Sequence, residues 1–419
     1  MRVEQRAGEL GAHRRLAVVA AQRTTEFVVE FLACLSAAHP IAIVDGDAGA
    51  AAVNETYCPD APGLELHQDL AVLSSTSGST GSAKLVRLSL DAVTSNAVAI
   101  ASSLSLTASD VAATVLPLQY CYGLSVLTSH LAVGARIVLT ELSVVDPCFR
   151  ALVDEHGVTG IAGVPHTFDM IERGRVEVLD APSLRYVTQA GGRLAPDHVR
   201  RLAERGRRSG FELFVMYGQT EATARMAVLD PVDLPEAAGS VGRAIPGGSF
   251  RIDEPDERGV GEGCYTGPNV MLGYASTRED LARGRQVHEL RAGDHGRLDD
   301  RGRLTITGRS SRIAKVHGKR IDLDHLESEL ALIGPDVSIV GDEEGLVVAV
   351  LDRDLPSDHE SGSVGVRLDA TLRQITAELV ELPVARVVAV SLADFPRTTS
   401  GKLDAPALCR VARASVDQH

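Results

Sequence analysis

A glycine- and serine-rich segment, residues 74–84 with the sequence SSTSGSTGSAK, combines groups that can hold phosphate. Its glycines permit positive φ and close backbone approach, and hydroxyls and one ammonium surround them. Backbone N–H groups, hydroxyls and a lysine can together wrap a triphosphate. The candidate phosphate contacts are Thr76, Ser77, Gly78, Ser79, Thr80, Gly81 and Lys84.

The spacing of this segment differs from that of the nucleoside-triphosphatase P-loop. Lys84 follows Gly81 by three residues, and no Ser or Thr comes directly after the lysine. Loops rich in Ser and Gly are common, so a flexible polar linker of the same composition is the alternative interpretation. The other motifs of the chain therefore have to decide between the two.

Five further motifs follow in order along the chain. They are LPLQYCYGL at 116–124, QAGGRLAP at 189–196, YGQTE at 217–221, GRSSRIAKVHGKRI at 308–321 and PRTTSGK at 396–402. Together with the glycine-serine segment they resemble the motifs of the ANL superfamily, which comprises acyl-CoA synthetases, nonribosomal adenylation domains and firefly luciferases. The resemblance extends from about residue 27 to Asp404. It implies an enzyme that activates a carboxylic acid with ATP.

The YGQTE motif is the more specific of these signals, because it directly follows the apolar run FELFVM. The resemblance implies that the ring of Tyr217 stacks on adenine and that the hydroxyl of Thr220 reaches the α-phosphate. Glu221 would hold Mg²⁺, a hard cation that prefers oxygen ligands. Gly218 and Gln219 complete the predicted nucleotide contacts in this motif.

Two further places are implied to hold the nucleoside. Gly191 and Gly192 would let the backbone approach the purine, although an ordinary strand-to-helix turn is the alternative. Asp294 would accept hydrogen bonds from the ribose diol and Arg309 would also meet the ribose. Ala292 replaces the threonine of the superfamily's T-G-D motif, and a simple turn aspartate is the alternative for Asp294.

The motif near the C-terminal end carries the predicted catalytic lysine, Lys402. In the superfamily such a lysine lies on a mobile small domain and reaches the carboxylate and the α-phosphate. Ser311 occupies the hinge position, where the superfamily usually has Asp and sometimes Lys. Rotation about this hinge would replace Lys402 by the face of the segment 315–320.

The acid pocket is implied by the 116–124 motif and by the segments around it. Tyr120 stands where acyl-CoA synthetases often carry His and where amino-acid-activating relatives often carry Asp, which disfavours an α-amino acid. His166 is either a pocket residue or a structural histidine held by hydrogen bonds. The pocket candidates are Tyr120, Tyr122, Gly163, Val164, Pro165, His166, Gln189 and Ala190.

The resulting functional hypothesis is formation of an acyl-AMP with release of pyrophosphate, using ATP and Mg²⁺, followed by acyl transfer to a thiol. The thiol would belong to CoA or to the phosphopantetheine of a carrier protein, with a role in secondary metabolism. One alternative is a ligase that passes the adenylate directly to an amine. Another is a catalytically inactive nucleotide-binding scaffold, against which Glu221 and Lys402 argue. The sequence does not identify the acid or the acceptor, and it leaves open whether the chain forms a homodimer.

These residues must be positioned by an α/β fold. From residue 14 to about 216, apolar runs rich in Val and Ile alternate with helix-like segments, which is typical of mostly parallel sheets covered on both faces. Strands are predicted at 16–20, 41–44, 70–74, 111–116, 136–140, 160–164, 184–188 and 212–216. Helices are predicted at 25–38, 91–104, with Ser89 as its cap, and 195–210.

The pattern changes along the rest of the chain. We predict a large N-terminal domain over 1–308, whose last part, about 239–308, is a small β subdomain. Residues 309–315 form a hinge, and 316–419 form a small α+β domain. Its predicted helices are 322–331 and 369–380, and its predicted strands are 337–340, 346–351 and 384–391. Only about seventy residues precede the phosphate segment, so the N-terminal subdomain is expected to be abbreviated.

Composition restricts the class of protein. The net charge of −14 argues against nucleic acid or an anionic membrane as the main partner. The six cysteines are scattered without a C-x-x-C pair, so neither a disulfide framework nor a zinc site is indicated. No stretch of 18 or more apolar residues occurs and the N-terminus has no apolar signal segment, which predicts a cytoplasmic protein.

Overall fold

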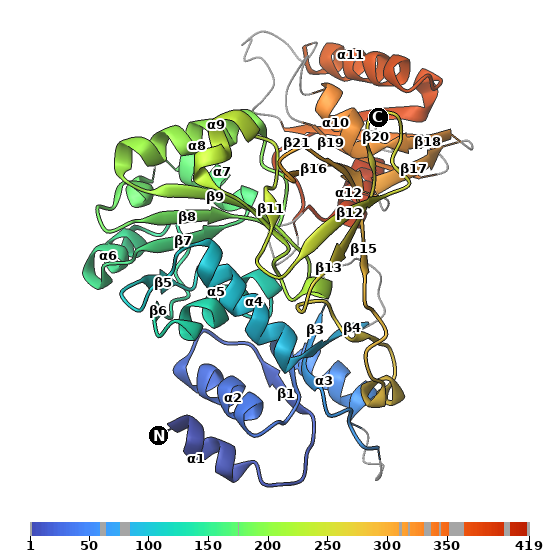
Figure 1. Cartoon of the computed structure of the whole chain (residues 1–419). Coiled ribbons are helices and arrows are strands. Elements are labelled where there is room, and N and C mark those ends of the chain that lie inside the picture. The colour runs from blue at the N-terminus through green and yellow to red at the C-terminus, as the bar shows by residue number, and fades with distance from the viewer. Residues whose placement is uncertain are drawn as a thin grey trace. The chain divides into compact units, whose positions relative to one another are not determined.

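The computed structural model of the chain divides into two compact units (Figure 1). Unit 1 comprises residues 1–251, 264–291 and 298–305, and unit 2 comprises 252–263, 292–297 and 306–419. The structure describes residues 2–58, 64–75, 84–174, 176–309, 312–316, 319–330, 337–342, 345–351, 364–397 and 403–416. Within these residues, no helix is long and apolar enough to cross a membrane.

Unit 1 is built around a seven-stranded sheet with the order β11-β10-β9-β8-β7-β5-β6. The central strands pair in parallel, whereas β10 and β11 are antiparallel additions at one edge. The strands are β5 (Val111–Ala113), β6 (Arg136–Val138), β7 (Gly160–Gly163), β8 (Tyr186–Gln189), β9 (Glu212–Tyr217), β10 (Ala227–Leu229) and β11 (Arg243–Ala244).

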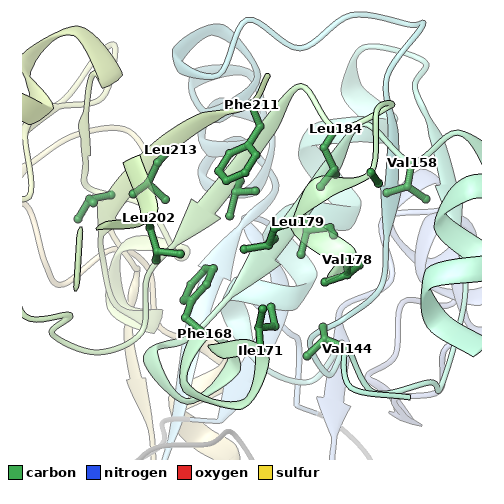
Figure 2. Close-up of a cluster of buried hydrophobic side chains, with 14 of the residues drawn as sticks. Val144, Val158, Phe168, Ile171, Val178, Leu179, Leu184, Leu202, Phe211 and Leu213 are labelled. Atoms are coloured by element: carbon green, nitrogen blue, oxygen red, sulfur yellow. The ribbon is translucent and has the colours of Figure 1, made fainter. Parts of the chain in front are cut away.

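Alternate residues of these strands point to opposite faces, and each face is buried by helices. On one face, Ile161 and Val187 join a large apolar cluster with residues of α6 (Pro147–His156), α7 (Pro165–Arg173) and α8 (Pro196–Ser209). Figure 2 shows Phe168, Ile171 and Leu202 of this cluster directed toward one another.

The other face is covered by α4 (Leu90–Ser103) and α5 (Cys121–Ala132), which pack on each other. The neighbouring strand residues Ala162 and Tyr186 point to this side and join a second cluster with Ile100 and Tyr122. Apolar strands can be buried on both faces, and this sheet accordingly has one apolar cluster on each side.

A second sheet of unit 1 has the order β1-β2-β3-β4-β14, with parallel pairing from β1 to β3 and antiparallel pairing of β4 and β14. Its strands are β1 (Ala17–Ala20), β2 (Ile41–Val44), β3 (Leu70–Ser75), β4 (Leu85–Ser89) and β14 (Gly273–Ala275). The helices of this region are α1 (Arg2–Glu9), α2 (Thr25–Ser36) and α3 (Gly46–Tyr57), and α9 (Leu234–Ala237) lies farther along the chain.

Four strands from the middle of the chain form a further sheet with the order β12-β13-β15-β16. They are β12 (Ser249–Asp253), β13 (Gly261–Thr266), β15 (Leu290–Leu298) and β16 (Leu304–Arg309).

The last part of unit 2 contains a three-stranded sheet, β19-β20-β21, and a hairpin of β17 and β18. Alternate residues of β20 again serve two apolar clusters, one with α10 and α11 and the other with α12. The elements are β17 (Ile313–Val316), β18 (Lys319–Asp322), α10 (Leu323–Leu330), β19 (Val337–Asp342), β20 (Gly345–Leu351), α11 (Val364–Leu379), β21 (Val387–Leu392) and α12 (Ala405–Val416).

The α/β class predicted from the sequence is confirmed. Every strand predicted in the first 216 residues is present within a few residues of its expected bounds. Ser89 also caps α4, since its side chain accepts a hydrogen bond from the backbone N–H of Ala92 at 3.0 Å. The domain boundary at 308 stays a prediction.

Candidate active site

The candidate site in unit 1 is organised by a tight turn after β9. The short helical turn Thr220–Ala222 leads into Thr223 and Ala224, whose φ angles are +54° and +93°. Two successive residues other than glycine with positive φ are strained, and such strain persists only where the surroundings enforce it. This turn separates Glu221 from Arg225 and directs the chain back into β10.

Buried amides hold the turn in place. The side-chain amide of Asn269 donates to the carbonyls of Ala222 and Arg225, both at 2.8 Å, and Asn96 donates to the same Arg225 carbonyl. Gly218 permits the close return of the chain, because a Cβ at that position would lie 1.9 Å from the carbonyl oxygen of Ala224. The glycine of the YGQTE motif is thus required by packing.

The carboxylate of Glu221 is fixed by a tyrosine of strand β14. The hydroxyl of Tyr274 donates to Glu221 Oε1 at 2.9 Å, and Nζ of Lys84 lies 3.5 Å from the centroid of the Tyr274 ring. Antiparallel pairing of β14 with β4, which places Tyr274 opposite Val86, brings this ring next to Lys84. Burial and the adjacent carboxylate raise the pKa of Tyr274, so that its hydroxyl stays protonated and donates.

This arrangement fits a hard divalent cation. The carboxylate of Glu221 has one oxygen engaged by Tyr274 and offers anionic oxygen of the kind that Mg²⁺ prefers. Lys84 is exposed and directly precedes β4, at the end of the phosphate segment. An ammonium and a carboxylate therefore lie around one aromatic ring, as binding of phosphate and of a metal would require.

The predicted purine turn lies at the end of β8. Gly191 has a φ of +81°, and a Cβ there would lie 2.4 Å from the hydroxyl oxygen of Tyr120. The buried side chain of Gln189 closes the turn by donating to the carbonyl of Gly192 at 2.9 Å. The sequence here requires glycine for both its φ and the approach of the tyrosine.

The other residues of the YGQTE motif lie at the same end of the sheet. Tyr217 is the last residue of β9, and only 8% of it is exposed because its ring packs against Phe250 at a centroid distance of 6.4 Å. Thr220 is buried, and Gln219 is half-buried. These residues are thus contiguous with Glu221 and Gly218.

Four of the predicted pocket residues share one apolar cluster on the α4–α5 face of the sheet, namely Tyr120, Tyr122, Val164 and Ala190. Tyr120 and Tyr122 make an edge-to-face contact at 6.3 Å. The others, Gly163, Pro165, His166 and Gln189, lie at the adjacent ends of β7, α7 and β8. Gly163 faces Phe168, whose ring would be 2.9 Å from an added Cβ.

A cavity opens on this same face, with about 300 Å³ of empty space counted to its open end. Of the predicted pocket residues, Tyr122 lines it, through a hydroxyl 2.7 Å from Thr188 Oγ1. Burial raises the pKa of Tyr122 to about 12. The guanidinium of Arg225 also lines this cavity and lies 4.7 Å from the Tyr122 ring centroid.

The two predicted ribose contacts meet within unit 2. Nε of Arg309, at the end of β16, lies 2.8 Å from Oδ1 of Asp294 in β15, and Asp294 is buried whereas Arg309 is half exposed. On the β17–β18 hairpin, the backbone of Lys315 is in register with that of Arg320.

Other predicted residues lie outside the described residues. These are the phosphate contacts Thr76, Ser77, Gly78, Ser79, Thr80 and Gly81, the hinge residue Ser311, and the catalytic lysine Lys402. Their roles remain predictions from the motifs.

Two residues of the site were missed by sequence reasoning. Tyr274 follows a glycine in an irregular stretch, and only the pairing of β14 with β4 brings it to Glu221. Arg225 could have been suspected, because it is a charge between the apolar residues Ala224 and Met226 directly after the YGQTE motif. A charged residue within such a run is expensive to bury unless it has a role.

The chain is similar in sequence to known proteins. The family described as AMP-binding enzyme matches residues 48–275. An indoleacetate–CoA ligase from Aromatoleum aromaticum is 33% identical over 78% of this chain and 64% of its own length. This chain therefore spans a little under two thirds of that relative.

Solved structures share the fold. An o-succinylbenzoate CoA synthetase from Bacillus subtilis, in complex with its acyl-adenylate intermediate, superimposes with a TM-score of 0.70 at 22% identity, covering 97% of this chain and 90% of the other. An amide bond synthetase from Marinactinospora thermotolerans gives a TM-score of 0.73 at 22% identity, covering 99% and 93%.

Proposed function

Since this chain belongs to the AMP-binding enzymes, the adenylate-forming ANL superfamily, we propose that it activates a carboxylic acid with ATP and transfers the acyl group to a thiol. The observation that carries the proposal is the placement of Glu221 and Lys84 around the ring of Tyr274. One carboxylate for a divalent cation and one ammonium for phosphate are what the first half-reaction needs.

In the first half-reaction, a carboxylate oxygen of the acid attacks the α-phosphorus of ATP. The bond from that phosphorus to the bridging oxygen breaks, and pyrophosphate leaves with the electron pair. Two anions must meet, so the protein acts mainly by positioning and by neutralising charge. Lys84 and the phosphate segment bind the phosphates, Thr220 binds the α-phosphate, and Lys402 neutralises the reacting carboxylate and α-phosphate.

Glu221 would hold Mg²⁺, which would supply positive charge to the phosphates. Tyr274 fixes the orientation of that carboxylate, as partners of metal ligands commonly do. Gly191 and Gly192, together with Tyr217, bind the adenine, and Asp294 with Arg309 binds the ribose.

In the second half-reaction, a thiolate attacks the acyl carbon of the adenylate and AMP leaves with the bridging oxygen. The proton of the thiol passes to solvent. The thiol of CoA is favoured as the acceptor by the relative that is a CoA ligase. An amine acceptor is the second candidate. In that case an amide forms directly from the adenylate, and CoA is not required.

Acid-dependent exchange of pyrophosphate into ATP tests the first half-reaction. We expect exchange with at least one member of a panel of alkyl, aryl and dicarboxylic acids, and a loss of at least about 100-fold in Lys402→Ala. Asn54→Ala, on the exposed side of α3, serves as the control that keeps exchange unchanged. Exchange by Lys402→Ala at the rate of the unaltered chain would exclude the role assigned to this lysine.

The acceptor is tested in a separate assay. AMP release from the acid that supports exchange is measured with CoA, with N-acetylcysteamine as a minimal pantetheine thiol, and with a primary amine. A thiol ligase requires CoA or the thiol for rapid AMP release. Rapid release with the amine alone would replace the thiol acceptor by the second candidate.

A further inference from the structure

Arg225 of unit 1 is a buried cation. Its exposure is 1%, and Nε has no hydrogen-bond partner. Among the described residues, no carboxylate forms an ion pair with it. Its side chain instead faces the Tyr122 ring at 4.7 Å. Burial lowers the pKa of the guanidinium, yet arginine stays protonated in proteins.

A second buried arginine of unit 1 shows what a structural role looks like. Arg87 has an exposure of 0%, and its guanidinium donates to the carbonyls of Tyr274 and Arg283 and to Oε1 of Gln286. Its donors are thus satisfied by the fold itself. Arg225 is equally buried and has no such partners among the described residues, although an unpaired buried charge is strongly destabilising.

The surroundings of Arg225 are those of a binding cavity. It lines the cavity together with Tyr122 and Thr188, whose hydroxyls are linked at 2.7 Å. His130 and Tyr186 also line it and bond to each other at 2.6 Å, while burial lowers the pKa of His130 and favours its neutral form. Arg225 is therefore the permanently charged group among the described lining residues.

Asp110 is an acidic group close enough to act on His130 and Tyr186 of the cavity lining, and it is already paired. Asp110 is 3% exposed and pairs with Arg185 at 3.0 Å, with Thr159 as a further donor at 2.9 Å. The field inside the cavity is thus positive, and it is strong because the walls are mostly apolar.

Residues that line the cavity lie close in sequence to residues of the site proposed for the first half-reaction. Thr188 lines it, and Gly191 lies three residues later in the turn against which the Tyr120 hydroxyl packs. Arg225 follows Glu221 by four residues, across the strained turn held by Asn269. An acid whose reacting carboxylate lies at that turn would direct its far end toward Arg225.

We propose that the acid carries a second anionic group, a distal carboxylate, which binds the Arg225 guanidinium in this cavity. The planar fork of an arginine suits a carboxylate, and a buried charge-assisted pair discriminates strongly against neutral groups. The cavity is small, which favours a short diacid over a long alkyl chain.

This inference rests on the proposed function for the identity of the site, but it is tested by binding. Calorimetric titrations use dicarboxylic acids of three to six carbons and the monoamide of each, with and without α,β-methylene ATP. At least one diacid is expected to bind about 10- to 100-fold more tightly than its monoamide. Arg225→Met removes this preference and Arg225→Lys keeps part of it.

Arg136→Met is the matched control, because it removes the same charge at an exposed position of β6. It should bind the diacid as the unaltered chain does. Equal binding of every diacid and its monoamide, or a preference that survives in Arg225→Met, overturns the distal-carboxylate proposal. Pyrophosphate exchange measured in parallel decides adenylation separately, since a chain that exchanges with monocarboxylic acids retains its proposed function whatever the titrations give.

Discussion

The guanidinium carbon of Arg225 lies 4.7 Å from the centroid of the Tyr122 ring, with both residues almost fully buried. A cation above an aromatic face gains about 2 kcal/mol when desolvated. That gain is smaller than the cost of burying an unpaired charge. The contact therefore holds the cation in place without compensating its burial, as expected of a group that awaits an anion.

Substitution of the two buried arginines should have different effects on stability. Arg225→Met removes an uncompensated charge, so the melting temperature should stay the same or rise. Arg87→Met leaves buried carbonyls without donors and should cost at least about 2 kcal/mol. Differential scanning calorimetry of both variants checks this. A fall in melting temperature for Arg225→Met as large as that for Arg87→Met would identify Arg225 as a structural residue.

Gly218→Ala should disable the site without unfolding the chain. Its Cβ would lie 1.9 Å from the Ala224 carbonyl oxygen, so the turn that places Glu221 and Arg225 must shift. A shift of about 1 Å can cost 100-fold in rate, and pyrophosphate exchange measures it. Gly8→Ala, where an added Cβ meets nothing within 4 Å, is the control and should keep full exchange. Normal exchange in Gly218→Ala would show that the position of this turn does not affect the first half-reaction.

Tyr274→Phe should weaken the response to Mg²⁺. The change removes the hydroxyl that orients Glu221 and leaves the ring under Lys84, so the Mg²⁺ concentration for half-maximal exchange should rise about 10- to 100-fold. Tyr57→Phe is the matched control, because its hydroxyl donates to the next residue of β14, Ala275, at 2.9 Å. It should lower stability only. An unchanged Mg²⁺ requirement in Tyr274→Phe would dissociate this tyrosine from the metal site.

The buried histidine of the cavity predicts a pH dependence of stability. Nδ1–H of His130 donates to the Val126 carbonyl at 2.8 Å, so Nε2 accepts from the Tyr186 hydroxyl, as only the neutral ring can. Burial lowers the pKa of His130 in the folded chain. Because the unfolded chain then binds the extra proton more readily, His130 contributes stability above its unfolded pKa of about 6.5.

This contribution is lost as the pH falls from about 6.5 toward the lower folded pKa. The melting temperature should therefore decrease more steeply between pH 7 and pH 5 in the unaltered chain than in His130→Gln. Comparison with His13→Gln, an exposed histidine, corrects for the general effect of removing one imidazole. Parallel curves for the unaltered chain and His130→Gln would contradict the buried neutral state.

Local patterns were sufficient to predict the parallel sheets. Runs such as Ile41–Val44 and Glu212–Tyr217 are apolar on both faces and are separated by helical segments, which is decisive for this architecture. Helices α3 and α5 were not predicted, because their sequences are short and contain many Gly, Ala or Ser residues with weak periodicity.

The motifs located Glu221 and the glycine turn, but they could not supply partners that are distant in sequence. Tyr274 comes to Glu221 through an antiparallel strand pair 53 residues away. The significance of Arg225 depends on the absence of a carboxylate around it among the described residues, which only the packed structure reveals. Long-range pairing and burial are thus the physical terms that sequence spacing does not contain.

Transfer of oxygen from the acid to AMP tests the central claim most directly. An acid that supports pyrophosphate exchange is labelled with ¹⁸O in both carboxylate oxygens and turned over with ATP and an acceptor. Attack of the carboxylate on the α-phosphorus, followed by cleavage at the acyl carbon, predicts one ¹⁸O in AMP by mass spectrometry. Unlabelled AMP, or label in inorganic phosphate with formation of ADP, would contradict activation through an acyl-adenylate.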